Sequence, residues 1–171
     1  MAVLKPQDVV LALYLAGAPP QTQSQLGRVL GLSQAEINNA LRRLRAARLL
    51  LEDARSVIVP NLLEFCLHGV KYAYAPVVGR ARRGIPTAGL ASPLKGKVLG
   101  EEGELVWPSA EGTVRAASLE PLHPCVIVAS QSDARLHELL ALVDGIRVGK
   151  SRMRQLAERA LIERLGGRPS P

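Results

Sequence analysis

A very short connection between two helical segments near the N-terminus constrains the fold more than any other feature of this sequence. Thr22 is a favourable N-cap for a helix predicted over residues 23–30, and Gly31-Leu32 supplies a tight turn after it. The next residues, Ser33-Gln34-Ala35-Glu36, have the pattern of a capping box, in which the serine side chain accepts from the amide three residues on and the glutamate reaches back. The sequence therefore predicts two helices joined by a two-residue turn.

The helix that begins at this capping box is predicted to run to about Ala47 and to have two chemically different faces. At about 100° per residue, its apolar side chains share one face: Ile37, Ala40, Leu41, Leu44 and Ala47. The opposite face carries Ala35, Asn38, Asn39, Arg42, Arg43 and Ala46, with Arg45 on its edge. A helix that presents amides and arginines on its outer face can enter the major groove of DNA.

Two further elements flank this pair of helices. Residues 6–17 predict a preceding helix, because Pro6 and Asp8 suit a first turn and apolar residues recur at helical spacing after them. Two short β-prone runs, residues 49–51 and 57–59, lie on either side of a polar segment and predict a hairpin after the third helix.

This order of helix, helix, tight turn, helix and hairpin resembles the winged helix-turn-helix of bacterial transcription regulators with a MarR-like DNA-binding domain. The resemblance covers roughly residues 5–60, about a third of the chain. Its most specific part is residues 22–37, and the Arg-Leu-Arg-Ala-Ala-Arg-Leu-Leu run at residues 43–50 is also typical of the family. It implies a DNA-binding domain over residues 1–60 that binds double-stranded DNA sequence-specifically, as a dimeric repressor.

The candidate DNA contacts of this domain divide into base contacts and backbone contacts. Asn38, Asn39 and Arg42 are predicted to read base edges, while Ala35 permits close approach or touches a thymine methyl group. Arg43 and Arg45 lie nearer the rim, where phosphate contact is expected. The full set of predicted contacts is Thr22, Gln23, Gln34, Ala35, Asn38, Asn39, Arg42, Arg43, Arg45 and Arg55, the last at the tip of the hairpin. The wing is short and acidic at Glu52-Asp53, which weakens its contact with phosphate.

Other interpretations of these segments stay open at this point. Asn and Arg on an outer helix face are commonly just solvated, and some winged helices bind protein. Residues 140–154 are similar to the C-terminal region of small helix-turn-helix proteins that accompany predicted nucleotidyltransferase toxins. That similarity implies an alternative function, an antitoxin or protein-interaction module that neutralises a toxin through its C-terminal region.

The remaining chain predicts a mostly α (α+β) protein with a mixed, helix-ended C-terminal region. Asn61 with Glu64 can cap a helix over residues 62–71. An irregular, Gly- and Pro-rich stretch follows over residues 75–112. Both belong to a connecting region over residues 61–131. Residues 114–117 and 126–129 are weak strand candidates. Two amphipathic helices, about 133–147 and 151–165, form a C-terminal pair over residues 132–171 that offers either core packing or a homodimer seam.

Charge is distributed unevenly along the chain, whose formal net charge is +7. Residues 60–100 contain six basic and one acidic residue, and residues 101–131 contain one basic and five acidic residues. Arg80, Arg82 and Arg83 lie in the irregular stretch and are predicted to clamp DNA as a basic arm. The alternatives are an acidic partner, a solvated loop, or ion pairs within the chain to the acidic residues, which are Glu101, Glu102, Glu104, Glu111 and Glu120.

Several other function classes find little support in the sequence. Aromatic residues make up only 3% of the chain, which argues against a protein that stacks single-stranded bases on aromatic platforms. Cys66-Leu67-His68 and His123-Pro124-Cys125 form a mirrored pair, but side chains two residues apart on a helix point away from each other. We therefore expect no enzyme, no metal site and no cofactor. The apolar run at residues 9–18 is too short to span a bilayer, so we expect a cytoplasmic protein without a membrane partner.

Overall fold

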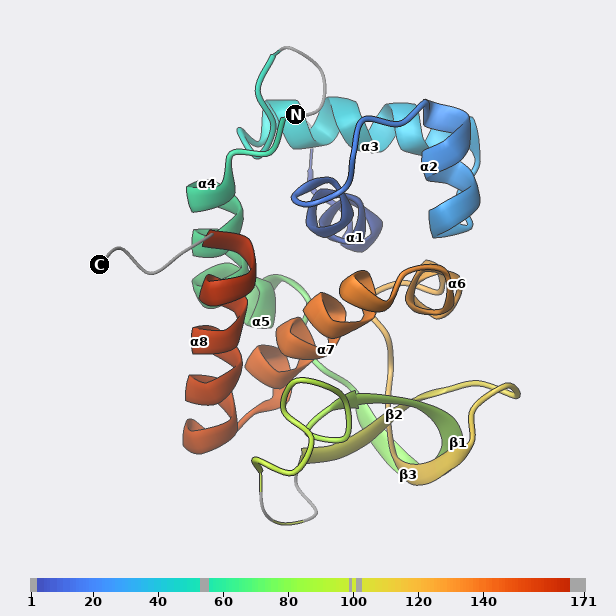
Figure 1. The fold of residues 1–171 in the computed structure, drawn as a ribbon, viewed down its shortest axis with the longest axis vertical. Helices are drawn as coiled ribbons and strands as arrows, with labels where there is room; N and C mark the ends of the chain where they lie inside the picture. Colours follow the sequence, from blue (N-terminus) through green and yellow to red (C-terminus); the bar gives the residue numbers. More distant parts are fainter. Residues whose placement is uncertain (1–2, 53–55, 99, 101–102, 167–171) are drawn as a thin grey trace.

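The computed structural model describes residues 3–52, 56–98, 100 and 103–166, which form a mainly helical α+β fold (Figure 1). A three-helix unit lies at one end of the longest axis and a small sheet lies at the other end, with the helix α7 (Ala134–Val148) between them. The expected fold class is confirmed.

The N-terminal unit consists of α1 (Pro6–Leu15), α2 (Gln23–Leu30) and α3 (Gln34–Ala46), which confirms the three predicted helices. Thr22 caps α2, because its side chain accepts a hydrogen bond from the amide of Gln25 at 3.2 Å. Gly31 follows α2 with a φ of +65°, a left-handed conformation that favours glycine. The turn between the two helices is therefore built as the sequence predicts.

The predicted hairpin is reduced to a single bridge between Leu50 and Val57 in the described part of the chain. The amide of Leu51 donates to the carbonyl oxygen of Ser56 at 2.9 Å beside this bridge. The tip, residues 53–55, lies outside the described residues, so the predicted position of Arg55 is not tested.

A helical segment follows the hairpin and consists of α4 (Val59–Glu64), the π-helical turn η1 (Phe65–Gly69) and α5 (Val70–Ala73). It begins three residues earlier than predicted, with Pro60 in its first turn, where the missing N–H is not needed. The prediction of Asn61 as N-cap is wrong. Its side chain donates instead to the carbonyl oxygen of Arg48 at 2.7 Å and so ties α4 to the turn after α3.

Residues 75–112 differ most from the sequence prediction, because they are not irregular. They contain β1 (Val78–Ala88) and β2 (Glu104–Pro108), and β3 (Val114–Leu119) completes a closed three-stranded sheet. β1 pairs antiparallel with both other strands, and β2 and β3 pair parallel. Residues 78–83 of β1 are all exposed, so this half of the strand lacks the alternation that marks a half-buried strand.

The two weak strand candidates have different outcomes. Residues 114–117 belong to β3, which confirms the first. Residues 126–129 belong instead to a helix, α6 (Cys125–Ser132), so the second is wrong. A four-residue apolar run does not by itself distinguish a buried strand from a buried helix segment.

Helix α7 and α8 (Ser151–Gly166) confirm the two helices predicted at the end of the chain. Asp133 caps α7 by accepting a hydrogen bond from the amide of Leu136 at 2.7 Å. Residues 139–147 of α7 are all buried, because this helix packs against α8, α6, β1 and α1. The apolar face of α7 is therefore part of the core of the chain and cannot form an interface between two copies. The division at residues 60 and 131 remains a prediction.

A buried polar network joins α7 to the sheet. The carboxylate of Asp144 accepts hydrogen bonds from Thr87 Oγ1 at 2.8 Å and Trp107 Nε1 at 2.7 Å, and it pairs with Arg147 Nη1 at 2.7 Å. Arg147 Nε also donates to the carbonyl oxygen of Tyr74 at 2.9 Å. Burial raises the pKa of Asp144, while the positive charge of Arg147 and these hydrogen bonds act in the opposite direction. One carboxylate thus organises contacts from β1, β2 and α7.

We expect Asp144→Ala to lower the free energy of unfolding by about 3–5 kcal/mol, because it leaves the buried Arg147 charge and two donors without their acceptor. Urea unfolding followed by circular dichroism measures the change. Glu163→Ala, at an exposed position on α8, is the control and should change stability by less than about 0.5 kcal/mol. Equal stability of the two variants would show that the network contributes nothing.

Candidate nucleic-acid interface

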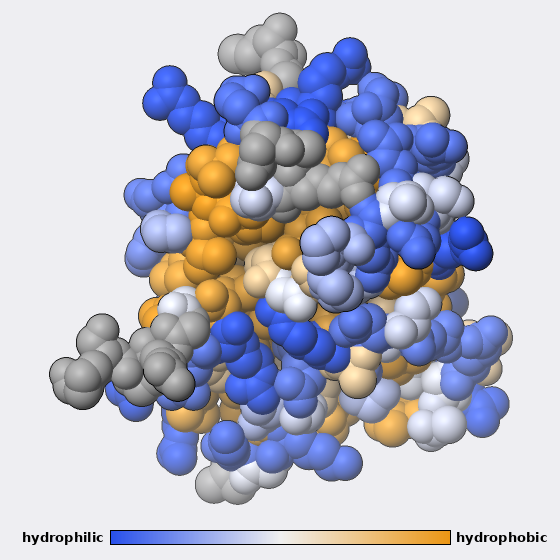
Figure 2. All heavy atoms as spheres, turned by 45° about the horizontal axis from the view of Figure 1, so that its top comes forward, coloured by the Kyte–Doolittle hydropathy of each residue, from blue (hydrophilic) through white to orange (hydrophobic). Residues whose placement is uncertain are grey.

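The outer face of α3 is exposed and polar. Ile37, Ala40, Leu41 and Leu44 are buried on the inner face, where α3 packs against α1 and α2. The outer face consists of exposed residues: Gln34, Ala35, Asn38, Arg42 and Ala46. With this end of the molecule turned forward, hydrophilic side chains cover much of the surface, and an apolar area lies to the left (Figure 2). The face predicted to meet DNA is therefore open to a partner.

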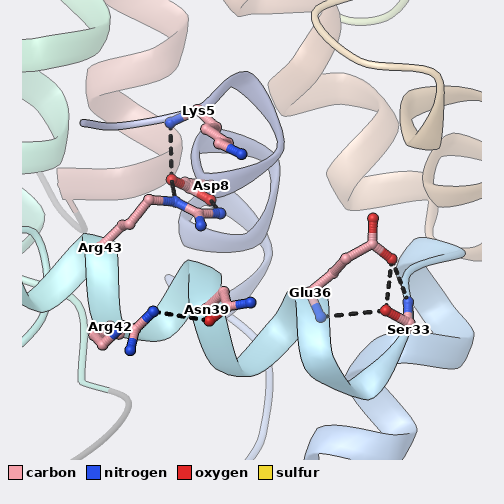
Figure 3. A network of polar contacts seen from close by, with 7 residues as sticks. All are labelled: Lys5, Asp8, Ser33, Glu36, Asn39, Arg42 and Arg43. Carbon is pink, nitrogen blue, oxygen red and sulfur yellow. Dashed lines mark hydrogen bonds and ion pairs between the residues drawn. The ribbon is translucent and has the colours of Figure 1, made fainter. Parts of the chain in front are cut away.

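Arg42 and Asn39 form a contact on this helix. Arg42 Nη2 donates to Asn39 Oδ1 at 3.0 Å, which restrains the guanidinium group (Figure 3). Asn39 is half-buried, whereas Asn38 is exposed. An asparagine that recognises adenine uses both its carbonyl oxygen and its amide nitrogen. Asn38 is consequently the better placed of the two for such a contact.

Arg43 has a different environment from the one the sequence suggested. Its Nε and Nη2 donate to the two carboxylate oxygens of Asp8, both at 2.7 Å, and the amide of Lys5 donates to Asp8 at 2.8 Å (Figure 3). The Asp8 side chain is 0% exposed and that of Arg43 is 15% exposed. The hydrogen bonds to Asp8 raise the pKa of Arg43. Arg43 therefore fixes α3 on α1 and is not placed to contact phosphate, which corrects its predicted role.

The capping box at the start of α3 is present as predicted. Ser33 Oγ accepts from the amide of Glu36 at 3.2 Å, and the carboxylate of Glu36 accepts from the amide and hydroxyl of Ser33 at 2.8 and 2.7 Å (Figure 3). These hydrogen bonds to Ser33 lower the pKa of Glu36. The box fixes the residue at which α3 begins and hence which side chains face outward.

The start of α2 lies beside the start of α3. A hollow of about 510 Å³ is lined there by uncharged polar side chains that include Thr22, Gln23, Gln25 and Gln34. Amide groups at a helix N-terminus favour an anion. The structure thus brings Thr22 and Gln23 together with Gln34, three of the residues predicted to contact DNA. Arg45, half-buried on α3, lies on the edge of the outer face.

The three arginines of the predicted basic arm are not part of this surface. Arg80, Arg82 and Arg83 are exposed on β1, at the end of the molecule opposite α3 (Figure 1). They belong to a strand, so the prediction that this segment is irregular is wrong, while its contact with DNA stays a prediction. Arg115, to which no sequence motif drew attention, lies directly opposite Arg83 on β3. Only the strand pairing reveals that a basic residue from the acidic segment joins this cluster.

The ion pairs between these arginines and the acidic segment, one of the alternatives open from the sequence, are not observed in the described residues. Glu101 and Glu102 lie outside that part of the chain. Glu111 accepts a hydrogen bond from Gln131 instead. Neither Glu104 nor Glu120 forms an ion pair with an arginine of β1 within the described ranges.

The cysteine and histidine pairs do not assemble a reactive or metal-binding group. Cys66 and Cys125 are free and buried, and burial raises the pKa of each thiol to about 12. A thiolate is the form that binds metal or attacks an electrophile, so both thiols are poorly suited to either role. Among the described residues, no three His, Cys, Asp or Glu side chains gather as a metal site would require.

Comparison with known families identifies the N-terminal segment. Residues 4–56 match the MarR family. This match covers the three helices and most of the predicted hairpin, which is the segment that resembles a MarR-like winged helix-turn-helix. The three-stranded sheet and α6–α8 lie outside the match. Comparison with curated proteins and with solved structures finds no match. In the described ranges, no helix combines the length and apolarity needed to cross a bilayer.

Substitutions at Arg43 and at its neighbour Arg42 test whether Arg43 has a structural role and Arg42 lies free on the outer face. We expect Arg43→Ala to lower the free energy of unfolding by about 3–5 kcal/mol, because the carboxylate of Asp8 would remain buried without its cation. Arg42→Ala, on the exposed face, should change it by less than about 0.5 kcal/mol. Chemical denaturation measures both, and a larger decrease for Arg42→Ala than for Arg43→Ala would contradict the assignment.

Proposed function

We propose that the chain is a transcriptional repressor that binds a specific duplex DNA sequence through the outer face of α3. The observation that carries this proposal is the exposure of Asn38 and Arg42 on a capped helix within the segment that matches the MarR family. A recognition helix must be held by its inner face and leave its outer face free for the groove. Helix α3 meets both requirements.

Base contacts are assigned to three positions on one face of α3. Asn38 would pair with an adenine edge and Arg42 with a guanine edge, the bidentate contacts that these side chains favour. Ala35, at the first turn of the helix, would allow close approach to a base. Asn39 acts with Arg42, whose guanidinium it holds at 3.0 Å.

Backbone contacts are assigned to the edges of this face. Thr22, Gln23 and Gln34 surround the hollow at the start of α2, where a phosphate would meet amide groups. Arg45 would contact the backbone along the rim of the groove. Arg55 remains a prediction for the hairpin tip, and Arg43 is omitted because it is bound to Asp8.

Repression would follow from occupancy of an operator by two copies. A dimer with a twofold axis would place its two recognition helices on half-sites about 34–36 Å apart. The seam would have to lie away from the buried stripe of α7. A hollow of about 540 Å³ beside α4 combines apolar side chains such as Leu4 and Phe65 with the charged side chains of Arg48 and Glu64, and we place the seam there.

Selection of bound duplexes from a random library tests the proposal without a known operator. We expect one sequence to be enriched, and Asn38→Ala and Arg42→Ala each to weaken binding to it by about 1–3 kcal/mol, a factor of about 5–150. Fluorescence anisotropy measures the affinities. Arg159→Ala, which removes an exposed cation on α8, is the control and should bind as the wild type does.

Two outcomes would count against the proposal. Unchanged affinity for both α3 variants would place the recognition surface elsewhere. A selection that enriches no sequence would favour the second candidate, a protein-interaction module, although the family match gives no support to a toxin partner.

A further inference from the structure

The first half of β1 and its partner strand form a narrow ribbon rich in arginine. We define the basic ribbon as residues 78–84 of β1 paired with residues 114–119 of β3. Ser118 and Leu119 of β3 are buried and β2 pairs with residues 117 and 118, so the exposed part of the ribbon is β1 up to Arg83 together with Arg115. Residues 78–83 are exposed in succession, which means that both faces of this part of β1 meet solvent. The ribbon lies at the end of the molecule opposite α3 (Figure 1).

The strand register distributes the arginines over both faces. Arg83 and Arg115 lie directly opposite each other and therefore share one face. Arg82, the preceding residue of β1, points to the other face together with its partner Ala116. Arg80 falls at the irregularity in the pairing between Gly79 and Ala81. Cationic side chains thus project from two sides of the same pair of strands.

Two features make this arrangement more than an ordinary solvated surface. Like charges directly opposite each other destabilise a sheet, and Arg83 and Arg115 form such a pair. Within the described ranges, none of Arg80, Arg82, Arg83 and Arg115 forms a hydrogen bond or ion pair through its side chain. An anionic partner would relieve the repulsion and use all four guanidinium groups, which suit forked contacts with phosphate.

The shape of the ribbon indicates what kind of polyanion fits. The residues next to the arginines are small, since they are Gly79, Ala81, Ala116 and Ala117. A hollow of about 510 Å³ lies beside the ribbon and is lined by Arg82, Arg83, Pro108, Ser109 and Ala110. The major groove of duplex DNA admits a two-stranded ribbon, and its two walls carry phosphates. At the exposed part of the ribbon, Arg82 on one face and Arg83 with Arg115 on the other are placed to reach both walls, whereas an acidic protein surface would engage one face.

We propose that the basic ribbon binds the phosphate backbone of duplex DNA, as a second contact separate from α3. A single-stranded ligand fits less well, because Trp107, beside the ribbon on β2, is buried and offers no platform for base stacking. Since the two surfaces lie at opposite ends of the molecule, the ribbon holds a segment of duplex other than the one that α3 reads. This inference does not require α3 to recognise bases.

The test compares two double variants of the full chain that each remove two exposed arginines. Arg82→Ala/Arg83→Ala alters the ribbon, and Arg152→Ala/Arg159→Ala on α8 is the charge-matched control. The probe is a 20-base-pair duplex of arbitrary sequence, about two helical turns, with affinity measured by anisotropy over a range of salt concentrations. We expect the ribbon variant to bind more weakly and to reduce the slope of log K against log salt by about 0.9 for each phosphate that the two arginines neutralise. The control should keep the wild-type slope.

Three results would overturn the proposal. The first is a ribbon variant with the same affinity and salt slope as the control. The second is a ribbon variant that loses as much affinity for a single strand of the same sequence as for the duplex, which would show that the ribbon does not depend on the shape of the duplex groove. The third is displacement of the duplex by poly-glutamate at equal charge, which would indicate an acidic protein partner.

An Asn38→Ala/Arg42→Ala variant, measured on the selected sequence, separates this inference from the proposed function. If the α3 variant binds more weakly while the ribbon variant keeps the wild-type slope of log K against log salt, the ribbon contact is overturned and recognition by α3 is supported. The reverse pattern would support the ribbon and overturn recognition by α3.

Discussion

The ion pair between Asp8 and Arg43 determines how α3 is presented to the outside of the molecule. A carboxylate with 0% exposure needs a cation and further donors, and Arg43 and the amide of Lys5 supply them. Because the pair joins α1 to the fourth residue from the end of α3, it fixes the rotation of α3 about its own axis. Asn38 and Arg42 face outward as a consequence, so the candidate interface depends on an ion pair that lies outside it.

A similar arrangement occurs where α7 meets the sheet. Asp144 is also a buried carboxylate with one arginine partner, and it connects α7 with Thr87 and Trp107 of the sheet. Buried charges of this kind are costly unless every partner is in place. The two carboxylates therefore define the relative positions of α1 and α3 in one half of the chain, and of α7, β1 and β2 in the other.

Local signals in the sequence were sufficient for the helices of the interface. The capping residues Thr22 and Ser33 and the glycine at position 31 act over a few residues, so their pattern predicts where α2 and α3 begin and end. The role of Arg43 could not be predicted in this way, because its partner lies 35 residues earlier and helical periodicity alone places Arg43 on the outer side. A charged residue within the apolar run of α1 was the available signal, but Asp8 also suits a first helical turn.

The sheet could not be predicted from the sequence, because its strands lack the local pattern that the helices have. Strand prediction depends on one face being buried, and residues 78–83 have no buried face. Gly84 lies so close to β2 that a β-carbon there would be 2.1 Å from the carbonyl oxygen of Trp107. No local sequence pattern predicts this close approach. Arg115 belongs to the basic ribbon only through its pairing with Arg83 across the sheet. These features arise from tertiary pairing between segments that are distant in the sequence.

The turn between α2 and α3 also has a neighbour outside the matched region. A β-carbon placed at Gly31 would lie 3.1 Å from Cβ of Val128 on α6, so the glycine leaves room for that helix as well as adopting its left-handed conformation. Closely packed groups transmit displacement because they cannot be compressed. A ligand or mutation that shifted α6 would therefore also displace the start of the turn between α2 and α3, so the C-terminal half of the chain is mechanically coupled to the orientation of α3.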